Sequence, residues 1–144
     1  MSEREPRLVV QTSPFLRQGV TTPMLMVDVL VALVPVTAAA VWAFGACALL
    51  VTAAATAGAL AVEWLATNER PRSRALGDGS AALTGVLVGL TVPPGLPLWM
   101  AFLGGAIGIG LGKTVWGGLG YNLFNPALVG RAFLQAAFPT AITT

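Results

Sequence analysis

The chain has 144 residues, of which 56% are hydrophobic and only 10% charged, and its formal net charge is +2. A mean hydropathy of +0.79 indicates a protein dissolved in lipid, because so few charges cannot cover a water-soluble surface. One cysteine, Cys47, and no histidine exclude an intrachain disulfide, a histidine base, a zinc site and an iron–sulfur cluster supplied by this chain alone.

The first two long apolar runs, 22–44 and 46–65, predict a transmembrane hairpin that turns at Gly45. Three arginines precede the hairpin and three follow it, whereas its tip carries no charge. Positive charge marks the cytoplasmic side, so the basic balance indicates topology rather than nucleic-acid binding. We therefore expect a cytoplasmic tail at 1–21 and a multi-pass transmembrane domain at 22–144.

Two acidic residues of this hairpin invite different interpretations. Asp28 lies about 10 Å into the first predicted span, where a bare carboxylate is costly. It could serve an ion or proton path, pair with a neighbouring helix, or stay near interfacial water. Glu63 is close to the end of the second span, so we expect its carboxylate to reach the lipid headgroups.

Two further apolar runs, 80–92 and 126–138, are too short to cross a bilayer. Thirteen residues make a helix of roughly 20 Å, against a hydrocarbon core of roughly 30 Å. Prolines end the first of them, and the run 96–112, just long enough for a span, follows and ends at Lys113. We predict two half-helices whose amino ends face a polar site at mid-depth in the membrane.

The residues that open these short helices are the candidate site residues. Asn125 and Pro126 specify a capped helix start, and Asp78 or Ser80 can cap the earlier one. Each cap could equally be structural. Arg131 lies one turn inside the second short helix and needs an anionic partner, a flavin phosphate or a water-filled cavity. The predicted site therefore comprises Asp78, Ser80, Asn122, Asn125 and Arg131.

Small residues recur every four positions in two of the predicted helices. Such stripes let helix backbones approach closely in lipid, and packing explains them better than any cofactor does. The two stripes are Ala81, Gly85 and Gly89, and Gly104, Gly108 and Gly112.

Four segments together resemble, in order, the first part of the D subunit of the Rnf complex. That subunit belongs to the membrane family shared with the B subunit of the sodium-translocating NADH:quinone oxidoreductase. The segments that carry the resemblance are 13–17, Thr22 with 26–35, 78–85 and 124–133. The resemblance covers nearly all of this chain but only the front of the family's usual length, so we expect a fragment or a version that partner subunits complete.

The resemblance implies an all-α bundle of two inverted halves, similar to urea transporters, in an inner-membrane respiratory complex. That complex would pass electrons between ferredoxin and NAD and translocate sodium ions or protons. It also implies FMN joined through its phosphate to the threonine of a Ser-Gly-Ala-Thr motif, and a second, non-covalent flavin such as riboflavin. This chain contains no Ser-Gly-Ala-Thr, so none of its residues is assigned that role.

Two alternatives from other classes remain open from the residues alone. Half-helices and an Asn-Pro-Ala sequence also suit a channel or facilitator for a small neutral solute. A structural membrane scaffold, in which the glycine stripes only pack helices, is the other.

Overall fold

The computed structural model describes residues 19, 21–66, 77–118 and 121–143, and all secondary structure in these residues is helical. Three helices are long and apolar enough to cross a membrane by length and composition. These are α1 (Thr22–Phe44), α2 (Ala46–Ala66), and α5 (Leu98–Gly112) continued by the short 3-10 helix η1 (Thr114–Trp116). The shorter helices are α4 (Ser80–Thr91), α6 (Pro126–Ala137) and α7 (Pro139–Thr143).

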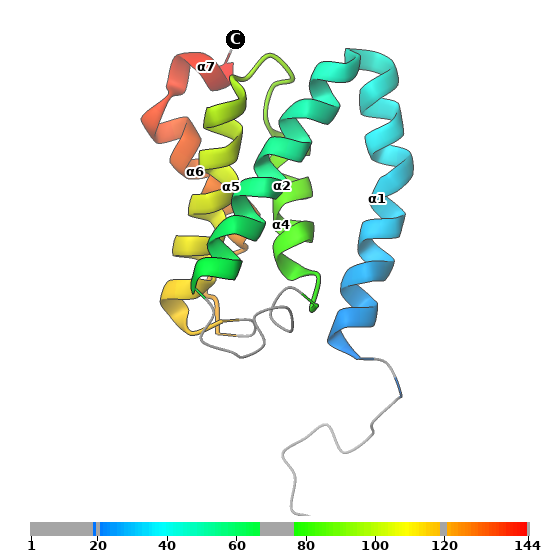
Figure 1. The fold of residues 1–144 in the computed structure, drawn as a ribbon. Coiled ribbons are helices and arrows are strands. Elements are labelled where there is room, and N and C mark those ends of the chain that lie inside the picture. The colour runs from blue at the N-terminus through cyan, green and yellow to red at the C-terminus, as the bar shows by residue number, and fades with distance from the viewer. Residues whose placement is uncertain (1–18, 20, 67–76, 119–120, 144) are drawn as a thin grey trace, which may run out of the picture.

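Helices α2, α4 and α5 form the centre of the bundle, with α6 packed on α5 (Figure 1). Helix α1 stands apart on one flank, and none of its residues is buried. The predicted hairpin is confirmed: Gly45 has φ 75° and its N–H donates to the carbonyl of Val41 at 2.8 Å. A polytopic helical membrane domain is therefore the architecture of the described residues.

The small-residue stripes are where the helix backbones touch, which confirms the packing interpretation. A Cβ placed on Gly85 or Gly89 would overlap the backbone of α2 at Thr56 or Thr52. On α5, a Cβ at Gly112 would lie 2.6 Å from the Cα of Pro126. Since lipid gives helices little hydrophobic drive to associate, the van der Waals contact that these close approaches allow contributes to their attraction.

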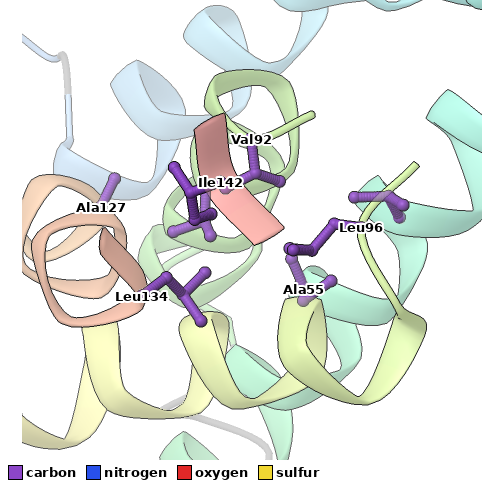
Figure 2. Close-up of a cluster of buried hydrophobic side chains, with 9 residues drawn as sticks. Ala55, Val92, Leu96, Ala127, Leu134 and Ile142 are labelled. Carbon is purple, nitrogen blue, oxygen red and sulfur yellow. The ribbon is translucent and has the colours of Figure 1, made fainter. Parts of the chain in front are cut away.

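The apolar core lies between α2, α4, α5 and α6, and α7 closes it at one end (Figure 2). Val92 and Leu96, in the link between α4 and α5, are buried there beside Ile142 of α7. Helix α7 is not among the elements predicted from the sequence. It begins at Pro139, directly after the φ −135°, ψ 60° break at Phe138.

Both short helices have 12 residues, about 18 Å, so the half-helix lengths are confirmed. The predicted inward position of their amino ends is wrong. Helix α4 starts beside the last turn of α2, and Pro126 at the start of α6 lies against Gly112, the last residue of α5. Both amino ends therefore lie at one end of the bundle rather than half-way along it.

Candidate functional site

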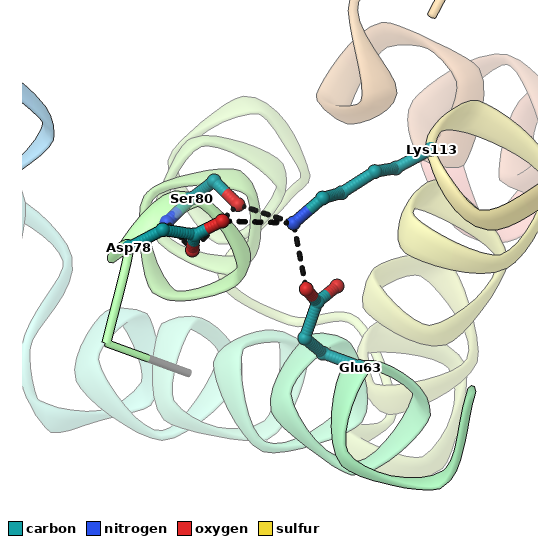
Figure 3. A network of polar contacts seen from close by, with 4 residues as sticks. All are labelled: Glu63, Asp78, Ser80 and Lys113. Carbon is teal, nitrogen blue, oxygen red and sulfur yellow. Dashed lines mark hydrogen bonds and ion pairs between the residues drawn. The ribbon is translucent and has the colours of Figure 1, made fainter. Parts of the chain in front are cut away.

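A cluster of four polar side chains lies where the ends of α2 and α5 meet the start of α4 (Figure 3). The Lys113 ammonium donates to Glu63 Oε1 at 2.6 Å and to Ser80 Oγ at 2.6 Å. It also contacts Asp78 Oδ2 at 3.2 Å. One ammonium therefore ties the end of α5 to residues of α2 and of the start of α4 that lie 33 to 50 positions earlier in the sequence.

The second carboxylate oxygen of Asp78 organises the start of α4. Asp78 Oδ1 accepts hydrogen bonds from the backbone N–H and the hydroxyl of Ser80, both at 2.9 Å. Gly79 occupies the cap position itself with φ 72°, a left-handed conformation that glycine adopts without strain. Asp78 thus orients Ser80, and Ser80 in turn presents its hydroxyl oxygen to Lys113.

The cluster is almost closed to solvent. The side chains of Lys113 and Glu63 are 6% and 9% exposed, and that of Asp78 is 23% exposed. Two carboxylates and one ammonium give the cluster a formal charge of −1. Every buried side-chain nitrogen and oxygen in the described part of the chain has a hydrogen-bond partner. A buried charge pair with its hydrogen bonds satisfied is tolerated, whereas removing one partner is costly.

The expectation that Glu63 reaches the headgroups is wrong, because its carboxylate is buried against Lys113. Sequence reasoning missed this pair, since each charge alone ends an apolar run in an ordinary way. The predicted topology nevertheless contained the information needed to find it. The hairpin and the returning span place Glu63, Asp78 and Lys113 at the same end of the bundle, and opposite charges there are expected to pair.

The predicted site residues fall into two groups. Asp78 and Ser80 belong to the Lys113 cluster. Asn125 accepts from the N–H of Ala127 at 2.9 Å and so caps α6, while Asn122 Nδ2 donates to the carbonyl of Phe124 at 3.2 Å. Arg131 is exposed on α6 and forms no ion pair with a described residue. The two groups adjoin at the Gly112–Pro126 contact, beside Lys113.

Comparison with known proteins decides the family. A family model described as NQR2, RnfD, RnfE matches residues 9–144. The chain belongs to the NQR2/RnfD/RnfE family. The resemblance seen in the sequence is therefore confirmed, and it includes the helix starts at Ser80 and Pro126 that build this end of the bundle.

Several curated members of this family are similar to the chain. The D subunit of the ion-translocating oxidoreductase complex of Aeromonas salmonicida is 42% identical over 137 residues, which cover 94% of this chain and 39% of that protein. The D subunit of the proton-translocating ferredoxin:NAD(+) oxidoreductase complex of Clostridium ljungdahlii is 37% identical over 135 residues, which cover 94% of this chain and 41% of that protein.

A third relative, the D subunit of the ion-translocating oxidoreductase complex of Rhodobacter capsulatus, is 41% identical over 126 residues. Those residues cover 86% of this chain and 35% of the relative. The chain thus spans about two fifths of the length of the relatives it matches.

Proposed function

We propose that this chain is the first part of a membrane-embedded D subunit in an ion-translocating oxidoreductase complex of the inner membrane. The complex would couple electron transfer between ferredoxin and NAD to the movement of sodium ions or protons. The single observation that carries this proposal is the family match over 9–144 together with about 40% identity to proteins named as that subunit. The three apolar helices long enough for a membrane support the same assignment.

The proposal extends to FMN, which this family implies, and the residues near the start of α6 fit its phosphate. Arg131 is exposed and free of a described ion-pair partner, so its guanidinium could hold an anion with two parallel hydrogen bonds. The amide group of Asn125 keeps its NH₂ donors, because only its oxygen is used to cap α6. We assign Arg131, Asn125 and Asn122 to contact with the flavin.

Asp78 and Ser80 fit a phosphate less well, since the carboxylates of Asp78 and Glu63 would repel a second anion. Their contacts favour a structural role instead. They hold Lys113, and through it the end of α5 on which Pro126 is seated. When bound, the flavin supplies the electron-transfer chemistry, while the protein supplies position and charge. The threonine of a covalent attachment is assigned to no residue of this chain.

A hybrid subunit tests the proposed function. Residues 9–144 would replace the aligned segment of the Aeromonas salmonicida relative in a strain that lacks its own copy. We expect membrane vesicles to regain electron transfer between ferredoxin and NAD, and ion uptake that depends on it. A hybrid that assembles at normal levels but restores neither activity would overturn the proposal, as would solute flux in proteoliposomes without any redox partner.

The flavin assignment has its own test in the same hybrid. We expect Arg131→Ala to lower the bound flavin per hybrid several-fold, measured by absorbance and by fluorescence of the denatured protein. Arg131→Lys should retain more of it, because it keeps the positive charge. Gln135→Ala, one turn further along the exposed side of α6, is the matched control. Equal flavin content in all variants, or none in the parent hybrid, would contradict the assignment.

A further inference from the structure

The face of α1 that points away from the bundle carries the carboxylate of Asp28. Asp28 is exposed and forms no hydrogen bond or ion pair with a residue that the structure describes. It lies six residues after the start of α1, about 9 Å along the helix axis. A carboxylate at that depth in an apolar span needs a partner or water.

Helix geometry fixes the direction of this carboxylate. An open apolar groove of about 660 Å³ separates α1 from α2 and α4, and Leu30 lines it. Two residues turn a helix by about 200°, so Asp28 lies on the side opposite to Leu30. Thr37 and Val41, which follow Leu30 at helical spacing, line the same groove and confirm which side of α1 faces inward.

A second polar group lies on the outer side. Pro35 has no N–H, so the carbonyl of Val31, four residues earlier, lacks its usual helical donor. Val31 is 63% exposed and lies three residues after Asp28, hence on the same side of α1. Both groups, the carboxylate and the carbonyl, are acceptors. A partner that supplies hydrogen-bond donors and positive charge would therefore complement this face.

The shape of this face suits a helix. Asp28, Ala32, Pro35 and Ala39 follow one another at spacings of four, three and four residues, and all are exposed. Alanines at such positions let a second helix come close in lipid. Because the rest of the stripe is apolar, a water-filled path is not favoured along it. A helix with one buried cation satisfies both the apolar stripe and the acceptors.

The geometry points to this face of α1 as an interface for a transmembrane helix of another subunit, one that carries an arginine or lysine at the depth of Asp28. The relatives named as complex subunits make another subunit the expected source of that helix. The inference rests on the proposed assembly into a complex. Positive charge opposite Asp28 is the feature that distinguishes it from mere contact with lipid.

Photo-crosslinking in the intact membrane complex tests this interface. A photo-reactive amino acid would replace Ala32 on the outer face or, as the matched control, Leu33 in the groove. We expect only position 32 to give a product with a second membrane subunit, with the attachment point within one turn of an arginine or lysine. Products with lipid alone, or with a later part of the same polypeptide, would overturn the inference.

Charge exchange provides the second measurement. We expect Asp28→Lys to lower the amount of assembled complex at least tenfold, and an aspartate in place of the crosslinked cation to restore it. Asp28→Asn in the isolated subunit should leave membrane insertion unchanged, because Asp28 forms no hydrogen bond or ion pair with a described residue. Normal assembly with Asp28→Lys would overturn the inference. If the unmodified complex assembles but shows no electron transfer, that result would instead count against the proposed function.

Discussion

Gly105 of α5 lies directly against the backbone carbonyl of Ala55 on α2, so closely that a Cβ at position 105 would overlap the carbonyl oxygen. A carbonyl within a helix cannot tilt away on its own without weakening its helical hydrogen bond, so only a shift of the whole helix would make room. The contact between α2 and α5 therefore requires glycine at this position. Gly58 makes the reciprocal contact, against the carbonyl of Phe102.

Gly105→Ala is accordingly expected to force α2 and α5 apart and to lower the free energy of unfolding by about 1–3 kcal/mol or more. The measurement is a denaturant titration of the purified protein in detergent. Gly110→Ala is the matched control on the same helix, since the nearest atom to its Cβ is 3.8 Å away. Equal stability of the two variants would show that α2 and α5 are not in close contact.

Gly104→Ala should have an intermediate effect. Its Cβ would lie 2.5 Å from Leu134 Cδ1, the tip of a side chain that can rotate. We expect a loss smaller than that of Gly105→Ala, measured in the same titration. Leu134→Ala opens space beside position 104. In that background, adding Gly104→Ala should change the free energy of unfolding little relative to Leu134→Ala alone. If Gly104→Ala is equally destabilising in the Leu134→Ala background, contact with Leu134 is not the cause of its effect.

Asn125→Ala removes the side-chain oxygen that caps α6. We expect a loss of about 1 kcal/mol, typical of such caps, and faster amide hydrogen exchange in the first turn of α6. Asn125→Asp keeps the accepting oxygen and should preserve both properties. An unchanged exchange rate at Ala127 in the alanine variant would argue that the cap contributes nothing.

The helices were readable from the sequence because their signals are local. Apolar run length, Gly45, the prolines after Val92 and the Asn125-Pro126 pair fixed the bounds to within two residues. The position of the amino ends at one end of the bundle depends on contacts between distant helices, such as Gly112 with Pro126, which no local pattern encodes. Asp78 and Ser80 were recognised as polar candidates from their own helix start, whereas their partners Glu63 and Lys113 follow only from the topology that brings the three charges to one end of the bundle.

The buried ion pair of Glu63 with Lys113 joins the ends of α2 and α5 beside the start of α4. Lys113→Met leaves a buried carboxylate without its cation and is expected to lower the free energy of unfolding by about 3–5 kcal/mol. The double change Glu63→Gln with Lys113→Met should lower it by less than the sum of the two single changes. Gln135→Ala, on the exposed side of α6, should be neutral.

A double-mutant cycle on the free energy of unfolding tests the ion pair most directly. We predict a coupling energy of about 0.5–3 kcal/mol between positions 63 and 113, as residues in one ion-pair network show. If the effects of the two single changes on the free energy of unfolding are simply additive, the two side chains do not interact in the folded protein. That result would contradict the central role given to this pair.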